Sequence, residues 1–512
     1  MATLLVVMYY PLLFINDGWG LAYILYVVAA QFFIACTFAF FASFITNETA
    51  YKIFSSIILV CICTHSLLSA TCLISTHAPL SDDIIAAILA TNANETSEFV
   101  SSYVDTKVIL SWIGMAAALV LTRAIKRKTR IEKARKALCI ATTAMFAASA
   151  CLTFHNKAVM QETAIGFAAS TVEFSKMSRI KVKRSHPKLT VKHEGQPPLI
   201  IWIIGEALTN HHCSIYGYSK NTNPLLQKKV DNGDVLLFRN VKSAGTGTLE
   251  SFQLMMSTYE KAQGNKVKWN ECTMLPDVAR AAGYHTAWLS NQSKKGLYDN
   301  VVGQYSELCD TNIFIGNRYA GLQRLNHDGE LLPVLRSMLK HSANRELCIV
   351  HLMGCHQKFE CRYPKSFARF SEKDYPERSI SQRSKVAAYD NAVAYNDFVV
   401  NAMFDMVKQR DAIVIYAPDH GLDIYESRPD YAGHAKTNNP IGLKAAHDIP
   451  FLVFITEPFR RLHPDITARL QRNTDTEFDT ENMIYLLMDI MQCDIVNGKT
   501  NTKSLARGHD KA

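Results

Sequence analysis

Long apolar runs in the first 155 residues constrain what this chain can fold into. Leu21–Ile45, Ile53–Ser75, Val108–Ala124 and Ala137–Phe154 are each long and apolar enough to cross a lipid bilayer, and Thr3–Ile15 is a shorter fifth candidate. A bundle of buried helices in a soluble protein is the alternative, but four or five such runs in so short a stretch favour spans. The sequence therefore predicts an N-terminal multi-span helical membrane domain over residues 1–155.

Charged residues between the apolar runs predict the orientation of this domain. Arg123–Lys136 is dense in Lys and Arg and holds a single acidic residue, Glu132, and a short loop this basic stays in the cytoplasm. Thr76–Thr106 instead carries Asp and Glu with no Lys or Arg, which fits the outer side. The last span then exits the cytoplasm, so everything after about residue 155 is expected on the extracytoplasmic side.

Residues 156–198 are expected to link the membrane domain to a second domain over 199–512. The linker mixes Lys and Arg with apolar residues, which suits either a solvated connector or a segment lying on anionic headgroups. The net charge of +9 arises partly here and in the basic loop. Because the basic residues follow the membrane rather than one face of a folded domain, nucleic acid is not an expected partner.

Three apolar runs in the second domain predict strands of a parallel sheet that is buried on both faces. Leu199–Gly205 is followed directly by Glu206, Leu347–His351 ends in histidine, and Ala412–His420 ends in Asp-His. One Glu after a strand is more often a solvated loop residue. Three strands that deliver Glu, His and Asp-His to one edge, where ligands of open α/β sheets bind, favour a metal site instead.

The residue types at this edge predict the metal. Glu206, Asp419 and His420 offer two carboxylates and one imidazole, a set that suits Zn²⁺ or Mn²⁺ better than Ca²⁺ or Mg²⁺. A fourth ligand is missing from this set. A threonine hydroxyl beside such a metal could be both the fourth ligand and a nucleophile, because the metal would stabilise its alkoxide.

The segment SAGTGTLES, residues 243–251, supplies two candidate threonines, Thr246 and Thr248, at the start of a helical run. Capping is the usual role of a hydroxyl there, yet a helix N-terminus is also where phosphate is best held. Side chains that remain to neutralise a phosphate and protonate a leaving oxygen are His351, His356, His434 and Lys295.

Several motifs, taken together in their order and spacing, carry a family resemblance. They are ATNANETSEF, GE…HCSIYGY…TNP, SAGTGT, WLSNQ, HLMGCH…RYP, YDNAVAYND and APDHG. With these motifs the chain resembles the phosphoethanolamine transferases of the bacterial inner membrane, which modify lipid A and core heptose. That group lies within the alkaline phosphatase and sulfatase superfamily. The resemblance implies an α/β/α sulfatase-like catalytic domain over residues 199–512.

The resemblance also implies the site residues. Zinc would be held by Glu206, Thr248, Asp419 and His420, with one ion bound tightly and a second left open. Thr248, the second threonine of GTGT, would be the nucleophile that becomes phosphoethanolaminylated.

Further residues match the family's substrate site. His356 and His434 correspond to histidines that hold a second metal or the substrate phosphate and take part in catalysis, and His351 accompanies them. Gln292 and Lys295, just after the WLSN run, lie where the family binds the phosphoethanolamine group. Departures from the family pattern after Glu206 and after the DHG motif concern the acceptor and the second metal rather than the reaction.

The expected reaction is a double displacement from phosphatidylethanolamine, through a modified Thr248, to lipid A, a core sugar or another surface glycolipid or glycan. The enzyme would lie among membrane lipids as a multi-pass protein of the bacterial inner membrane with its catalytic domain in the periplasm. A phosphoglycerol transferase of the lipoteichoic acid synthase type is the alternative. A sulfatase-like hydrolase fits less well, because no Cys/Ser-x-Pro-x-Arg sequence is present.

Cysteines in the second domain would face an oxidising compartment under this topology. Cys355 and Cys361 bracket a short loop that a disulfide could close, and Cys272–Cys309 is a second candidate pair.

Overall fold

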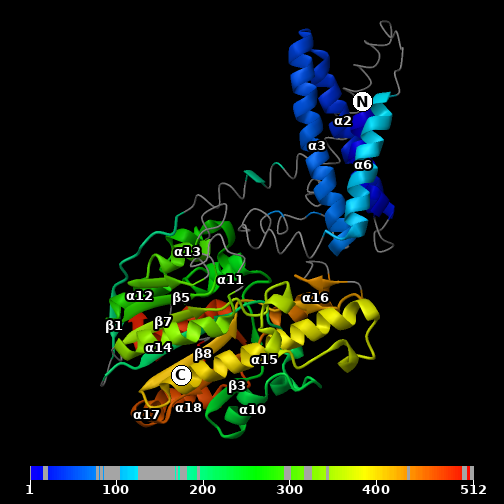
Figure 1. Ribbon diagram of the computed structural model, residues 1–512. Coiled ribbons are helices and arrows are strands. Elements are labelled where there is room, and N and C mark those ends of the chain that lie inside the picture. The colour runs from blue at the N-terminus through cyan, green and yellow to red at the C-terminus, as the bar shows by residue number, and fades with distance from the viewer. Residues whose placement is uncertain are drawn as a thin grey trace. The chain divides into compact units, whose positions relative to one another are not determined.

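The chain divides into two compact units, Met1–Arg179 and Ile180–Ala512, seen in the computed structural model (Figure 1). The structure describes residues 2–14, 21–76, 80, 85, 104–124, 168, 171–172, 181–192, 196–292, 294, 301–315, 326–341, 345–429, 431–434, 439–496, 498 and 504–507.

The N-terminal unit is helical over its described residues. Its elements are α1 (Ala2–Tyr9), η1 (Tyr10–Phe14), α2 (Leu21–Ser43), α3 (Glu48–Thr76) and α6 (Thr106–Ala124). Apolar side chains from all four α-helices meet in one cluster that includes Val7, Ile34, Ile62 and Met115. The indole of Trp112 in α6 also donates to the Thr71 hydroxyl of α3 at 3.1 Å.

Within the described residues, one helix is long and apolar enough to cross a membrane, namely Glu48–Ser75, and it contains the predicted span Ile53–Ser75. Shorter apolar helices cover Thr3–Phe14 and Thr106–Leu121. The predicted span Ala137–Phe154 lies outside the described residues. The predicted helical character of this region is therefore confirmed where it is described, while crossing by more than one helix stays a prediction.

The second unit is built on a seven-stranded mixed sheet. Its strands, in spatial order, are β3 (Val235–Phe238), β11 (Phe451–Ile455), β8 (Ala412–Pro418), β2 (Leu199–Gly205), β7 (Glu346–His351), β5 (His285–Ser290) and β6 (Thr311–Phe314). The five strands from β8 to β6 are parallel, as predicted for the three apolar runs. β11 runs antiparallel to both of its neighbours, so the sheet is mixed.

Helices cover both faces of this sheet (Figure 1). One face packs against α11, α12 and α19, and the other packs against α10, α14 and α15. The α-helices of the unit are α10 (Pro224–Asp231), α11 (Thr248–Met255), α12 (Leu275–Ala281), α13 (Val301–Ser306), α14 (Leu331–His341), α15 (Ile380–Val407), α16 (Pro440–His447), α17 (Glu457–Leu462), α18 (Pro464–Arg472) and α19 (Met483–Ile490). The predicted α/β architecture of this domain is confirmed.

Shorter elements surround the sheet. Three two-stranded ribbons pair β1 (Leu189–Val191) with β13 (Cys493–Ile495), β9 (Asp423–Ile424) with β10 (Ala432–Gly433), and β4 (Val241–Lys242) with β12 (Phe478–Asp479). The 3₁₀ turns are η2 (Asn210–His212), η3 (Ser214–Tyr216), η4 (Lys261–Lys266), η5 (Trp269–Glu271), η6 (Asp328–Glu330), η7 (Phe359–Cys361), η8 (Lys365–Phe367), η9 (Glu372–Asp374) and η10 (Thr480–Asn482).

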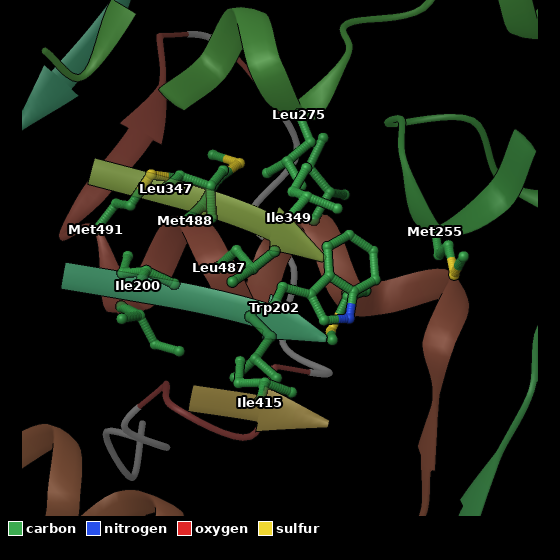
Figure 2. Close-up of a cluster of buried hydrophobic side chains, with 14 of the residues drawn as sticks. Ile200, Trp202, Met255, Leu275, Leu347, Ile349, Ile415, Leu487, Met488 and Met491 are labelled. Atoms are coloured by element: carbon green, nitrogen blue, oxygen red, sulfur yellow. The ribbon is translucent and has the colours of Figure 1, made fainter. Parts of the chain in front are cut away.

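Strand β2 lies at the centre of two cores, because alternate side chains of a strand point to opposite faces. Ile200, Trp202 and Ile204 enter one core, and Leu199, Ile201 and Ile203 enter the other. Figure 2 shows part of the first core, where side chains of β2, β7 and β8 meet those of the α19 region: Ile200, Trp202, Leu347, Ile349, Ile415, Leu487, Met488 and Met491. The uninterrupted apolar run in the sequence therefore reflects burial on both faces.

The register of the central strands decides which polar residues meet at the sheet edge. Ile204 of β2 pairs with His351 of β7, and Gly205 pairs with Pro418 of β8. The next residues along β2 and β8 are Glu206 and Asp419. The carboxyl ends of three adjacent parallel strands thus deliver the predicted ligand positions to one place.

Truncating a core side chain should destabilise this unit strongly. Ile349→Ala removes a fully buried side chain from β7, and a large-to-small change of this kind costs about 2–5 kcal/mol. Leu462→Ala is the matched control, because Leu462 is 56% exposed and its loss should cost only about 0.5 kcal/mol. Denaturant unfolding of the purified full-length chain would measure both. Equal effects of the two changes would contradict the assigned core.

Candidate metal and nucleophile site

Glu206, Asp419 and His420 form the centre of the candidate site. One ligand atom from each lies within 4.8 Å of the other two, and all three residues are buried. Nε2 of His420 is 3.2 Å from Oε1 of Glu206 and 3.7 Å from Oδ2 of Asp419. The structure thus brings together the three residues predicted as metal ligands.

The orientation of the His420 ring fits a metal ligand. Its Nδ1 lies 2.7 Å from the carbonyl oxygen of Gly421, which can only accept a hydrogen bond, so Nδ1 carries a proton. In a neutral ring the lone pair of Nε2 then faces the two carboxylates. Oε1 of Glu206, Oδ2 of Asp419 and Nε2 of His420 are buried without a hydrogen-bond partner among the described residues. Three buried atoms that converge on one point and carry lone pairs are the kind of ligands that a divalent cation such as zinc requires.

The pKa values of the three groups also favour a bound cation. Burial, with the nearby Glu206 charge, raises the pKa of Asp419 to about 8. Burial opposes ionisation of Glu206 too, but the close contact and charge of His420 outweigh it and hold the pKa of Glu206 low. Burial lowers the pKa of His420, while the charges of Asp419 and Glu206 raise it to about 9 overall. Two carboxylates this close need a positive charge between them, which a bound cation supplies.

Thr248 reaches the same centre from α11. It is the first residue of that helix, and its hydroxyl donates to Oε2 of Glu206 at 3.4 Å. The loop before it is tightly packed, since a Cβ on Gly245 would lie 2.9 Å from the backbone nitrogen of Ser251. Gly247 is the N-cap, so Thr246 is a turn residue before the helix rather than its cap. Of the two candidate threonines, Thr248 is the one whose hydroxyl contacts the ligand cluster.

Gln292 contacts the ligands as well. Its side-chain amide donates to Oε2 of Glu206 at 3.2 Å and to the carbonyl oxygen of Leu352 at 3.0 Å. It therefore fixes the orientation of the Glu206 carboxylate. The other predicted residue on this segment, Lys295, lies outside the described residues.

The three predicted histidines occupy different environments. His351 is fully buried at the end of β7, where burial lowers its pKa to about 4, and its ring lies edge-on to Phe252. His356 is half-buried and sits close enough to Glu206 to lower the pKa of that carboxyl. His434 is exposed, and its ring centroid is 4.9 Å from that of His420.

The loop after β2 is strained and tightly held, which the sequence did not reveal. Ala207 has φ +54°, in the left-handed region that non-glycine residues rarely adopt. Gly354, with φ +53°, packs on the other side of Glu206, because a Cβ there would lie 2.6 Å from the Glu206 nitrogen. Buried Asp328 accepts hydrogen bonds from the Gly354 and Met353 N–H groups at 2.8 and 2.9 Å. Gly354 thus packs against the backbone of Glu206, and Asp328, which is far from Glu206 in the sequence, fixes the loop that carries Gly354.

The predicted disulfides are wrong for this structure. Cys355 is not joined to Cys361 by a disulfide, and Cys272 is not joined to Cys309. Cys355 points into the apolar core beneath the site and is fully buried, whereas Cys361 is only half-buried. Cys355 and Cys361 are therefore close in sequence but do not form a disulfide.

A comparison with protein families identifies the domain. A family model described as sulfatase matches residues 198–492, which is more than half of the chain and runs from the residue before β2 to the residue before β13. The chain belongs to the sulfatase family. The cluster of Glu206, Asp419, His420 and Thr248 lies within the region matched to the sulfatase family.

Similar proteins narrow the place of the chain within the sulfatase family. The phosphoethanolamine transferase EptC of Escherichia coli O18:K1:H7 is 25% identical, over 86% of this chain and 80% of that protein. Among solved structures, the integral membrane protein lipooligosaccharide phosphoethanolamine transferase A from Neisseria meningitidis aligns with a TM-score of 0.72 at 20% identity, over 99% of this chain and 96% of that one. The predicted resemblance to phosphoethanolamine transferases is confirmed.

A metal-bound structure is also similar in fold. The C-terminal periplasmic domain of EptC from Escherichia coli, solved as a complex with zinc, aligns with a TM-score of 0.57 at 23% identity. The alignment covers 64% of this chain and 90% of that domain.

A second charged cluster ties together the segments that carry the ligands. His211, five residues after Glu206, lies 2.6 Å from the Glu426 carboxylate and 3.1 Å from that of Asp448. Lys444 of α16 also pairs with Asp448. His211 thus connects the loop after β2 with the turn between β9 and β10 and with the end of α16.

This cluster predicts a pH dependence of stability. The hydrogen bonds to Asp448 and then Glu426 raise the pKa of His211 to about 9, above the ordinary value near 6.5. A raised folded-state pKa contributes stability that is complete below pH 6.5 and is lost as the pH rises through 9. His211→Gln should therefore lower the thermal midpoint of the metal-loaded protein by roughly a few degrees at pH 6.5 and much less above pH 9. His186→Gln, at an exposed histidine, is the control. A stability difference between His211→Gln and the wild type that does not change with pH would contradict the assigned role.

Proposed function

We propose that this chain is a zinc-dependent phosphoethanolamine transferase that moves the headgroup of phosphatidylethanolamine, by way of Thr248, to lipid A or a core sugar. The observation that carries the proposal is the contact of the Thr248 hydroxyl with a buried cluster of two carboxylates and one imidazole. The names of the similar proteins support the choice of phosphoethanolamine.

Thr248 is the nucleophile. Zinc held by Glu206, Asp419 and His420 would act as a Lewis acid that favours the deprotonated hydroxyl and offsets phosphate charge. Thr248 is also the first residue of α11, so the first N–H groups of this helix lie beside it and would bind phosphate oxygens. In the first half-reaction a bond forms between Thr248 Oγ1 and phosphorus, the bond from phosphorus to the glycerol oxygen breaks, and diacylglycerol leaves after taking a proton.

In the second half-reaction an oxygen of the acceptor attacks the same phosphorus and the bond to Thr248 breaks, so the threonine recovers its proton. His356 and His434 hold the phosphate and exchange protons with the leaving and attacking oxygens. Gln292 keeps the Glu206 carboxylate in place, His351 supports this end of the sheet, and Lys295 binds the phosphate. These assignments follow from the family resemblance and, for the described residues, from their positions around Glu206.

Membrane attachment serves a lipid donor. Phosphatidylethanolamine stays in the bilayer, so an enzyme that uses it benefits from an anchor such as the apolar helix Glu48–Ser75. We place the chain in the bacterial inner membrane as a multi-pass protein, with about five spans over residues 1–155, a surface linker over 156–198 and a periplasmic catalytic domain over 199–512. The relatives named Kdo(2)-lipid A phosphoethanolamine 7''-transferase favour a lipopolysaccharide acceptor. A phosphoglycerol transferase would use the same threonine with a different donor lipid.

Replacing the nucleophile tests the proposal. Thr248→Ala should abolish transfer, both in a purified assay with phosphatidylethanolamine and in cells whose lipid A and core are analysed by mass spectrometry. Thr246→Ala is the matched control and should keep most of the activity, because Thr246 is a half-buried turn residue whose side chain is not in the ligand cluster, and its loss should cost about 1 kcal/mol or less. Wild-type cells with unmodified glycolipids, or an active Thr248→Ala variant, would contradict the proposal. Use of phosphatidylglycerol instead would support the alternative donor.

Removing the metal ligands tests the zinc site separately. Asp419→Asn and His420→Ala should each lose zinc and most activity while the protein stays folded and in the membrane, because each removes one of the three convergent ligands. Mass spectrometry would measure the metal content of each variant, circular dichroism of the same samples would measure folding, and the transfer assay would measure activity. Full activity of the wild type after exhaustive chelation would contradict a metal-dependent reaction.

A further inference from the structure

The motif YDNAVAYND, Tyr389–Asp397, takes no part in the chemistry proposed for Thr248. It lies in the middle of α15, and its polar side chains are buried. Buried polar groups cost free energy unless they are hydrogen-bonded. The partners of these side chains therefore indicate what the motif holds in place.

The partners are mostly backbone groups of surrounding loops. The Asp397 carboxylate accepts from the N–H groups of Leu225 and Leu226 at 3.0 and 2.9 Å, at the start of α10. The amide oxygen of Asn391 accepts from the N–H groups of Arg369 and Phe370 at 2.6 and 2.8 Å. The motif is thus a buried polar face of α15 that fixes loops.

Tyr389 holds a loop of the candidate metal site in the same way. Its hydroxyl donates to the carbonyl oxygen of Ala207 at 3.0 Å and accepts from the N–H of Thr209 at 3.1 Å. Both bonds span the turn that directly follows Glu206. Tyr389 and Thr209 are fully buried, so water could not replace the hydroxyl without rearrangement.

The turn held by Tyr389 also touches the other two ligands. The Ala207 N–H donates to Oδ1 of Asp419 at 3.3 Å, and the Leu208 N–H donates to the carbonyl oxygen of His420 at 3.0 Å. Ala207 adopts its positive φ within this turn, a conformation that costs free energy unless neighbouring contacts maintain it. These hydrogen bonds therefore contribute to the position of Glu206 relative to Asp419 and His420, beside the strand register and the contacts of Gln292 and Gly354.

We propose that Tyr389 is a positioning residue for the metal: its hydroxyl fixes the turn after β2 so that Glu206 meets Asp419 and His420 with the geometry of a metal site. This inference rests on the zinc site of the proposed function. The ring of Tyr389 packs edge-on against His212 and Phe359, each with centroids 5.0 Å apart, so phenylalanine would keep the packing and lose only the hydroxyl.

The test is the zinc affinity of Tyr389→Phe in the purified full-length chain, measured by competition with a chromogenic chelator. Loss of a residue that orients metal ligands typically weakens metal binding about 10–100-fold, and we expect a loss in this range. Tyr375→Phe is the matched control. Its ring is also buried and its hydroxyl donates to Asp390 at 2.5 Å, but it bonds neither Ala207 nor Thr209. The control should bind zinc like the wild type.

Thermal midpoints of the metal-free variants separate positioning from general stability. The inference is supported if both variants lose similar stability and only Tyr389→Phe loses zinc affinity. It is overturned if Tyr389→Phe binds zinc like the wild type, or if Tyr375→Phe weakens binding equally. A wild-type chain that does not bind zinc would instead refute the metal site of the proposed function, and this inference with it.

Ala207→Gly provides a second variant in case Tyr389→Phe alone does not fold. Glycine adopts a positive φ without the steric cost, so the turn should depend less on the tyrosine hydroxyl. If Tyr389→Phe folds, adding it to Ala207→Gly should weaken zinc binding less than it does in the wild-type chain. If Tyr389→Phe does not fold alone, the double variant should fold. A loss of affinity in the double variant that is as large or larger, or a double variant that also fails to fold, would contradict the proposed role.

Discussion

The pairing of β2 between β7 and β8 is the constraint on which the rest of the catalytic unit depends. It sets Glu206, His351 and Asp419 side by side at the carboxyl edge of the sheet. A shift of one residue would exchange the two faces of β2, moving its side chains into the opposite core and turning Glu206 away. Both cores therefore specify the register, and the register specifies the site.

The metal site carries an electrostatic cost that the surrounding structure offsets. Two carboxylates and an imidazole share a place from which water is excluded, and burying charge is unfavourable unless it is compensated. Gln292 and the Thr248 hydroxyl orient Glu206, and the carbonyl of Gly421 orients His420. The N–H groups of Ala207 and His420 donate to Oδ1 of Asp419. The protein itself thus holds the three candidate ligands in place, which would favour the binding of a cation.

Much of the site could be predicted from the sequence, because an apolar run followed by Glu or by Asp-His marks the end of a buried strand. The antiparallel direction of β11 and the contacts of Tyr389 could not, since they depend on tertiary structure. Tyr389 and Ala207 are 182 residues apart in the chain, and no local pattern links them. The disulfides were wrong for a related reason, because the spacing of Cys355 and Cys361 does not show that Cys355 points into the core. Ala137–Phe154 and Lys295 lie outside the described residues, so what the sequence indicates for them stays a prediction.

The covalent state of Thr248 tests the account most directly. Purified enzyme would be incubated with phosphatidylethanolamine but no acceptor, quenched in acid and analysed by peptide mass spectrometry. The account predicts one phosphoethanolamine on the peptide that contains Thr248, located on that residue by fragmentation, with release of an equal amount of diacylglycerol. Modification of Thr246 instead, or continued transfer to an added acceptor without any modified enzyme, would contradict the account.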